Sequence, residues 1–286
     1  MSVTVFKYMV QSEGIDYYCK VTEMIVRDTI SYDFAFGGLH TFCFIACMED
    51  KKDFIPYIDR VEYETDCVKM GTLEEFGGTA KLVRSALWTM KYLFPHITHF
   101  TLIDDSHINC ERGVRRHKMS LAYDTIFKSE QTWYEKRFHA KLKDDLMKSY
   151  KQSIQVINAP LIPFERIVQR YPKMHAYKDE YTQSTTPKEF MDALRKKYGN
   201  KYCYEVSDWL SDYAEYLGIK YYKQDWYIES SDLIKPDGYA LFLSDAPIRG
   251  GMKGKTRRRR RRYTGGRKPC VGYYGTFEDL ADQTRQ

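Results

Sequence analysis

The 286-residue chain lacks any apolar run long enough to cross a lipid bilayer. A membrane-spanning helix needs about 20 apolar residues, whereas the longest run here, residues 42–48, has the length of a strand. The first ten residues also lack the pattern of a secretory signal, because Lys7 lies among the apolar positions and no small-residue cleavage site follows. We therefore expect an intracellular protein.

The chain also lacks a Cys-x-x-Cys pair. Its seven cysteines are an odd number and lie at positions 19, 43, 47, 67, 110, 203 and 270. Without a secretory signal, this pattern predicts reduced, buried thiols and argues against a disulfide framework. Cys43 and Cys47 fall in the apolar run and are expected to be core residues.

Acidic residues are missing from residues 246–276, although the chain as a whole carries a formal charge of only +6. The basic block of this tail consists of Arg249, Lys253, Lys255, Arg257, Arg258, Arg259, Arg260, Arg261, Arg262, Arg267 and Lys268. Cations from Lys253 onward are the candidate nucleic-acid-binding residues, since neutralising phosphates releases counterions regardless of base sequence. Nuclear localisation or binding to an anionic membrane fits the same composition.

Before the tail, the pattern changes from strand-rich to helical. Residues 1–70 are rich in strand signals, with strands expected at 41–48 and 61–70. An amphipathic helix follows from Thr79 to Phe94 and is stopped by Pro95, and a strand is expected at 99–104. Further helices are expected around residues 119–126 and after Thr132, Thr186 and Ser207. A further strand is expected at 219–228.

This order predicts an α/β (α+β) fold, in which a mixed sheet flanked by helices is followed by a mainly helical second domain and a basic tail. The expected boundaries are 1–145, 146–245 and 246–286.

A glycine pair at the start of the first helix indicates a phosphate site. Gly77 and Gly78 precede Thr79 and Ala80, so the first backbone N–H groups of that helix have no partners within the helix. Such a helix start binds anions, and glycines let a pyrophosphate approach the backbone. The alternative is an ordinary turn before a helix.

From residue 40 to 140 the chain resembles the general N-acetyltransferase (GNAT) superfamily, and within it the acetyltransferase-like proteins of large DNA viruses. The resemblance rests on the glycine loop, the segment Leu102-Ile-Asp-Asp-Ser-His-Ile108 and the segment Thr132-Trp-Tyr-Glu-Lys-Arg-Phe138. It implies acetyl-CoA as cofactor, held by Gly77, Gly78, Thr79 and Ala80. It also implies that Tyr134 protonates the departing CoA thiolate.

Two features depart from the family pattern. Tyr134-Glu-Lys-Arg-Phe138 lacks the glycine of the corresponding family segment. Glu75 stands where the family has Arg or Gln, and its charge opposes phosphate binding.

Asp104, Asp105 and His107 follow the strand at 99–104 and are candidate proton acceptors from the amine substrate. The alternative is a turn in which these polar side chains bond to their own backbone. Asp104, His107 and Cys110 mix hard and soft donors without a second cluster, so a metal site is not expected.

Two functions stay open at this point. The first is transfer of an acetyl group from acetyl-CoA to an amine. The second is a non-catalytic virion or nucleoprotein component, in which the GNAT-like fold is a scaffold and the tail binds nucleic acid or neighbouring virion proteins. The location is then the host cytoplasm or nucleus, or the virion.

Overall fold

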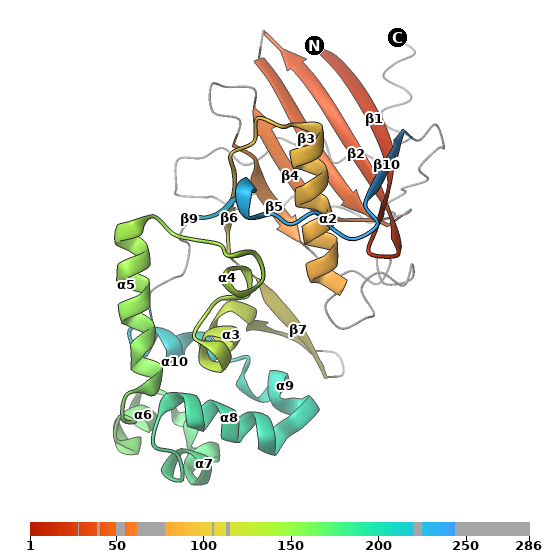
Figure 1. Ribbon diagram of the computed structural model, residues 1–286. Helices are drawn as coiled ribbons and strands as arrows, with labels where there is room; N and C mark the ends of the chain where they lie inside the picture. Colours follow the sequence, from red (N-terminus) through yellow and green to blue (C-terminus); the bar gives the residue numbers. More distant parts are fainter. Residues whose placement is uncertain are drawn as a thin grey trace. The chain divides into compact units, whose positions relative to one another are not determined.

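The computed structural model describes residues 1–27, 29–38, 41–49, 55–61, 78–104, 106–112, 115–219 and 225–243 (Figure 1). It divides the chain into two compact units. Unit 1 comprises Met1–Leu102 and the described chain from Ile228 onward, and unit 2 comprises Ile103–Tyr227. The mixed α/β class expected from the sequence is confirmed.

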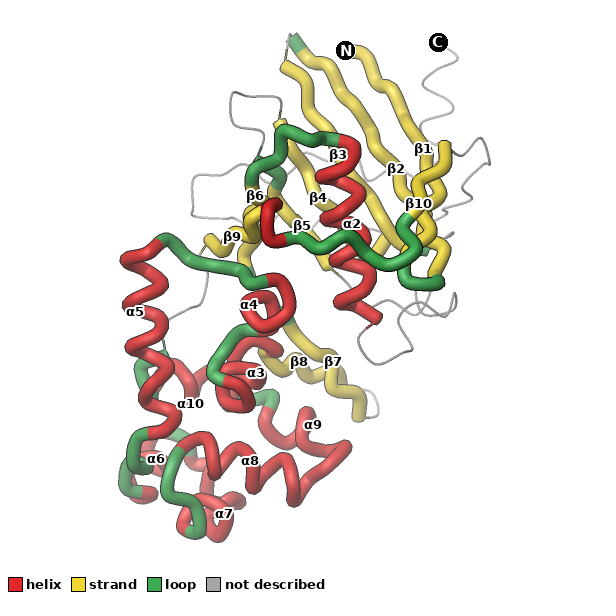
Figure 2. Tube along the Cα trace, in the orientation of Figure 1, coloured by secondary structure: helices red, strands yellow, loops and turns green. Residues whose placement is uncertain are grey.

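Unit 1 is built on a sheet of eight strands in the order β10-β1-β2-β3-β4-β5-β6-β9 (Figure 2). The strands are β1 (Ser2–Ser12), β2 (Ile15–Val26), β3 (Thr29–Gly37), β4 (Phe42–Glu49), β5 (Tyr57–Val61), β6 (His99–Ile103), β9 (Asp225–Glu229) and β10 (Ala240–Leu243). The ladders from β10 through β5 are antiparallel. The strand expected at 41–48 is β4, whereas most of the strand expected at 61–70 lies outside the described residues.

The buried face of this sheet follows from the two-residue period of its strands. Tyr17, Cys19 and Val21 alternate along β2, and all three are buried. Phe34 and Phe36 do the same on β3, and the ring of Phe36 packs 5.0 Å from that of Tyr17. Successive side chains of a strand point to opposite faces, so these residues lie on one face and form a continuous apolar core.

Helix α2 (Gly78–Leu93) supplies apolar residues to the core of unit 1. Leu82, Val83, Ala86, Leu87 and Met90 are all buried, as their three- and four-residue spacing predicts. Ser85 of α2 and Ser12 of β1 share a buried hydrogen bond of 2.6 Å. The helix expected from Thr79 to Phe94 is therefore confirmed.

Strands β5 and β6 pair in parallel, at Tyr57 with Thr101 and Ile58 with Leu102. Parallel neighbours need a crossover connection, and α2 lies in the connection between these two strands. This part of unit 1 is thus a strand–helix–strand element at the end of an antiparallel sheet.

Unit 2 contains one hairpin and most of the helices. Its elements are β7 (His107–Arg112), β8 (Arg115–Ser120), α3 (Leu121–Ser129), α4 (Trp133–Phe138), α5 (Asp144–Ile154), α6 (Phe164–Arg170), α7 (Lys178–Thr182), α8 (Pro187–Tyr198), α9 (Tyr202–Val206) and α10 (Leu210–Tyr216). Short 3₁₀ turns lie at Gln155–Asn158, Pro172–Tyr177 and Gly199–Lys201, and in unit 1 at Ser230–Asp232.

The sequence signals at the helix ends of unit 2 work as expected. Thr186 caps α8 by accepting a hydrogen bond from the backbone N–H of Glu189, and Pro187 occupies the first helical position. Gly199 follows the last turn with a positive φ of 49°. Thr132 caps α4 in the same way, through the N–H of Glu135.

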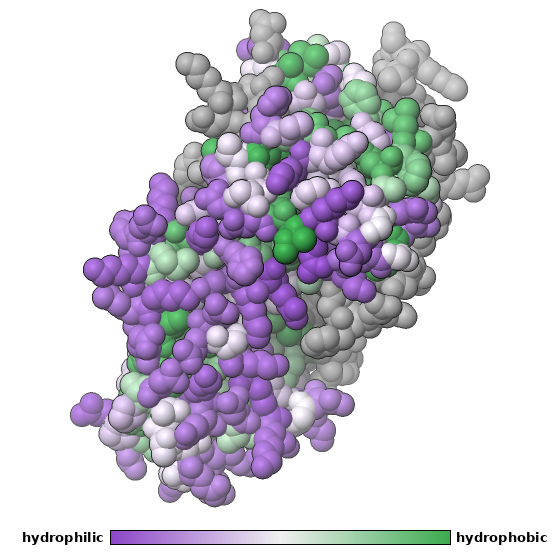
Figure 3. Space-filling model, in the orientation of Figure 1, coloured by the Kyte–Doolittle hydropathy of each residue, from purple (hydrophilic) through white to green (hydrophobic). Residues whose placement is uncertain are grey.

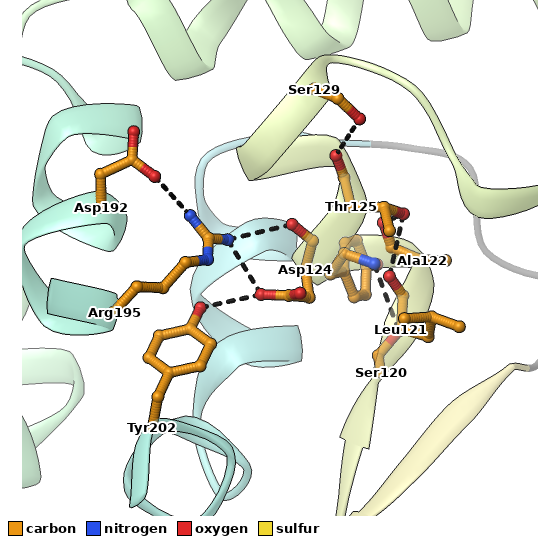
Figure 4. Close-up of polar contacts among 10 residues, drawn as sticks. Ser120, Leu121, Ala122, Asp124, Thr125, Ser129, Asp192, Arg195 and Tyr202 are labelled. Atoms are coloured by element: carbon orange, nitrogen blue, oxygen red, sulfur yellow. Dashed lines mark hydrogen bonds and ion pairs between the residues drawn. The ribbon is translucent and has the colours of Figure 1, made fainter. Parts of the chain in front are cut away.

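An ion pair within unit 2 connects three helices (Figure 4). Arg195 of α8 donates to the side chain of Asp124 on α3 at 2.9 Å and to the backbone oxygen of Asp124 at 3.0 Å. Tyr202 of α9 donates to the same carboxylate at 2.9 Å. Burial, and secondly the charge of Asp124, raise the pKa of Tyr202. The Tyr202 hydroxyl therefore stays a hydrogen-bond donor at neutral pH.

The division into units differs from the expected domain boundaries. The chain leaves unit 1 after Leu102 rather than after residue 145, and it returns at Ile228. Helices α3 and α4 accordingly belong with the later helices, because α3 packs against α8 and α10 and Glu135 of α4 bonds to α5. Phe127 of α3, for example, stacks on Tyr213 of α10 with the ring centroids 5.9 Å apart.

The visible surfaces of the two units differ in hydropathy (Figure 3). Apolar atoms gather over the β1 and β10 side of unit 1, where Val3, Val5, Phe6, Phe242 and Leu243 are exposed. The visible surface of unit 2 is mainly hydrophilic. In the described part of the chain, no helix combines the length and the apolar character that crossing a bilayer requires.

Candidate functional site

The glycine-rich helix start lies in unit 1. Gly78 is the first residue of α2 and is buried, as is Ala80, whereas Thr79 is partly exposed. Gly77 and Glu75 lie outside the described residues. Within α2 as described, the first turn holds no acidic side chain, so the N–H groups there keep the partial positive charge of a helix start.

Asp104 follows β6 and is buried in unit 2. Its Oδ1 accepts hydrogen bonds from the backbone N–H and the hydroxyl of Ser106. This is the polar turn that the sequence offered as the alternative to a proton acceptor. His107 begins β7 and is exposed, and Asp105 lies outside the described residues.

Tyr134, the candidate general acid, lies on α4 with only 6% of its surface exposed. Its ring packs against the rings of Trp133 and Phe138, with centroids 4.8 Å and 6.1 Å away. Burial raises the pKa of Tyr134, and the negative charge of Asp104 raises it further. The structure thus brings Tyr134 and Asp104 together, and it holds the phenol in its protonated form.

Glu135, the neighbour of Tyr134, is buried and directed at helix α5. Its carboxylate accepts a hydrogen bond of 3.0 Å from the Tyr150 hydroxyl and pairs with Lys151. The Glu-Lys part of the resemblance segment therefore joins α4 to α5.

The candidate nucleic-acid-binding residues of the tail, from Lys253 to Lys268, lie outside the described residues, so binding of nucleic acid by this block stays a prediction.

The structure corrects the expectation of reduced thiols. Cys110 and Cys203 form a disulfide that closes a loop of 93 residues, and Cys43 and Cys47 are disulfide-bonded as well. Cys19 is the buried thiol that the structure describes as free. The pairing was not predicted because spacing along a sequence does not reveal which cysteines meet when they come from distant elements.

A second polar cluster surrounds the Cys110–Cys203 disulfide, and sequence reasoning missed it. Cys110 on β7 is directly opposite His117 on β8. Nδ1 of His117 lies 2.8 Å from Oδ1 of Asp208, and the other oxygen of Asp208 accepts a hydrogen bond from Lys173 at 2.8 Å. These bonds, that from Lys173 first, lower the pKa of Asp208. We call Cys110, Cys203, His117 and Asp208 the cysteine–histidine cluster.

None of these groups forms a metal site in the described part of the chain. No group of three His, Cys, Asp or Glu side chains there is placed to hold a metal ion. Of the three residues weighed from the sequence, Cys110 is committed to a disulfide and its sulfur is no longer a thiolate ligand.

Comparison of the chain with protein family models, with curated proteins and with solved structures gives no significant match.

Proposed function

We propose that the protein is an acyl-CoA-dependent N-acetyltransferase that transfers an acetyl group to an amine. One observation carries the proposal: β5 and β6 are parallel, and α2, which opens at Gly78, lies in the connection between them. Ligands of α/β folds bind beyond the carboxyl ends of parallel strands, and phosphates bind at the helix start that follows such a strand.

In this proposal the pyrophosphate of acetyl-CoA binds the free N–H groups around Gly78 and Thr79. The resemblance gives Tyr134 of unit 2 the role of protonating the departing CoA thiolate, and this role is a separate part of the proposal. The raised pKa of Tyr134 keeps the phenol protonated, so the hydroxyl is present as a hydrogen-bond donor.

Calorimetric titration of the full chain with acetyl-CoA tests the first step. Thr79→Glu places a carboxylate in the first turn of α2. The negative carboxylate stabilises α2, because the start of a helix carries a partial positive charge. The same carboxylate repels a phosphate. We expect Thr79→Glu to weaken binding at least tenfold without lowering stability, while Thr79→Gln binds like the native chain. No heat at millimolar acetyl-CoA would rule the proposal out.

The second candidate is a non-catalytic scaffold whose basic tail binds nucleic acid. The specific observation in its favour is that the resemblance segment takes part in packing. Tyr134 is enclosed by Trp133 and Phe138, and Glu135 is bonded to Tyr150 and Lys151. A fold that keeps this segment for stability does not need it for chemistry.

The tail hypothesis is tested by removing residues 249–268 and measuring binding to duplex DNA across salt concentrations. The native chain is expected to bind with an affinity that falls steeply as salt rises, because each neutralised phosphate releases counterions. The deletion is expected to remove this binding. Equal retention of both proteins on DNA at every salt concentration would contradict the hypothesis.

A further inference from the structure

The cysteine–histidine cluster lies wholly in unit 2, and neither proposed function uses it. Its four residues come from three parts of that unit: Cys110 and His117 from the hairpin, Cys203 from α9 and Asp208 from the segment after α9. Residues directly opposite each other on antiparallel strands point to the same face, with Cβ atoms about 5 Å apart. The imidazole therefore lies beside the sulfur of Cys110.

His117 is held in one orientation by its neighbours. Its Nδ1 must donate to Asp208, because a carboxylate with a lowered pKa only accepts hydrogen bonds. Its ring meets the ring of Tyr204 edge-on with the centroids 4.8 Å apart. Tyr204 is the residue after Cys203, so the disulfide and the ring are positioned by the same helix.

The second ring nitrogen of His117 is unused. Nε2 is buried and has no hydrogen-bond partner among the residues that the structure describes. A buried polar atom without a partner costs free energy. A histidine whose Nδ1 is fixed by a carboxylate and whose Nε2 is unengaged is arranged to transfer a proton at Nε2.

The two sulfurs differ in their access to solvent. Cys110 is buried, with 4% of its surface exposed, whereas Cys203 is partly exposed. Asp208 and Lys173 are exposed at the same place, with 43% and 69% of their side-chain surfaces accessible. The cluster therefore reaches the surface on the Cys203 side.

We propose that the Cys110–Cys203 disulfide is a redox-active site that exchanges with a dithiol, with Cys203 as the attacked sulfur and His117 as the proton donor to Cys110. One thiolate of the dithiol attacks Sγ of Cys203 and the Cys110–Cys203 bond breaks. The electron pair of that bond goes to Cys110, whose thiolate takes a proton from Nε2 of His117, and the ring regains a proton from those that the dithiol releases to solvent. The second thiolate of the dithiol then attacks its own sulfur in the mixed disulfide and releases Cys203.

The products are an oxidised dithiol and two reduced cysteines, so two electrons move from the dithiol to the protein. A disulfide whose leaving sulfur is stabilised by a proton donor exchanges faster than one in apolar surroundings. Asp208 acts through His117 and is a positioning residue.

The first experiment measures the rate at which dithiothreitol reduces this disulfide in the folded full-length protein. Alkylation followed by peptide mapping separates Cys110 and Cys203 from Cys43 and Cys47. We expect His117→Gln to slow reduction at least tenfold and Asp208→Asn to slow it several-fold, both with unchanged urea midpoints. Lys173→Gln is the matched control, because it contacts the outer oxygen of Asp208, and it should react like the native chain.

Exogenous imidazole provides a readout that a packing role would not move. In His117→Ala it should restore part of the lost rate, whereas it should not accelerate the native chain. Equal rates in the native, His117→Gln and Asp208→Asn proteins would overturn the proposal. Reduction that occurs only at denaturant concentrations that unfold the chain would overturn it as well.

The direction of attack has its own test. Cys110→Ser leaves Cys203 as a single thiol, and Cys203→Ser leaves Cys110. We expect a disulfide reagent such as dithiodipyridine to react at least tenfold faster with Cys203 in the first variant than with Cys110 in the second. The opposite order would overturn the assignment of the attacked sulfur.

Discussion

Arg195 binds both the side chain and the backbone oxygen of Asp124 through one guanidinium nitrogen. The same nitrogen therefore joins α8 to the first turns of α3, and a second one, through Asp192, fixes the guanidinium to its own helix. The two charges of the pair are largely buried, with 18% and 14% of their side chains exposed. A pair of this kind stabilises a structure mainly by making the loss of one partner costly.

Replacing Arg195 by Leu should destabilise unit 2 strongly. Asp124 would keep its hydrogen bond from Tyr202 but lose its counter-charge, and an uncompensated buried charge costs about 3 kcal/mol. Urea unfolding measures the change. Lys188→Met is the control, because its pair with Glu130 is more exposed, with 30% and 39% of the two side chains accessible, and exposed pairs contribute little to stability. If both variants lost the same free energy of unfolding, the buried Asp124 pair would contribute no more to stability than an exposed pair.

Replacing Gly37 by Ala should destabilise unit 1. A Cβ at this position would stand 2.7 Å from the backbone oxygen of Thr41 and 2.8 Å from the N of Cys43, where the β3–β4 register shifts. Because backbone atoms cannot move aside cheaply, we expect a loss of roughly 1–3 kcal/mol in thermal or urea unfolding. A cost below that of Gly14→Ala, which meets no atom but strains a positive φ, would contradict this explanation.

Stability should fall as the pH rises from about 10 to about 12. Burial raises the pKa of Tyr181 to about 12, and it raises that of Tyr239 to about 12. An unfolded tyrosine ionises near pH 10, so the unfolded chain loses these protons first and is favoured increasingly across this window. Urea midpoints between pH 9 and pH 12 measure the slope. Tyr239→Phe should make the slope shallower, and constant midpoints across the window would be inconsistent with buried phenols.

Glu135 and Tyr134 should respond differently to substitution. Glu135→Ala leaves the buried Tyr150 hydroxyl without its acceptor, which we expect to cost about 2 kcal/mol of stability. Tyr134→Phe keeps the packed ring, so its stability should change by less than about 1 kcal/mol. If the protein transfers acetyl groups, Tyr134→Phe should slow the transfer while the chain stays folded. An unaltered rate would remove Tyr134 from the mechanism and favour the scaffold.

Signals that lie within one helix were predictive. The apolar spacing after Gly78 placed α2 to within one residue at each end, and Thr186 with Pro187 placed the start of α8. These patterns are local, because a helix satisfies its backbone within a single segment. The expected strand at 219–228 appears as β9, Asp225–Glu229.

The β7–β8 hairpin was not predicted, although both strands are six residues long. Residues 107–120 contain several charged side chains and few apolar ones, so the alternation of a half-buried strand is weak. The cysteine–histidine cluster depends on this hairpin and on a cysteine 93 residues later. Its members meet only through tertiary packing, which no local pattern encodes. The division of the structure at Ile103 was not predicted for the same reason, since the packing of α3 with later helices is a tertiary property.

The neighbouring positions of β6 and β9 in the sheet have a consequence for biosynthesis. A ribosome releases β6 first and must make the 121 residues between Ile103 and Asp225 before it begins β9. Before β9 is synthesised, the edge of β6 has no β9 partner. The edge of β1 stays unpaired for longer, because its partner β10 is synthesised after β9. The inserted unit can fold first on the emerging chain, so the sheet of unit 1 is completed last although six of its eight strands are synthesised before that unit.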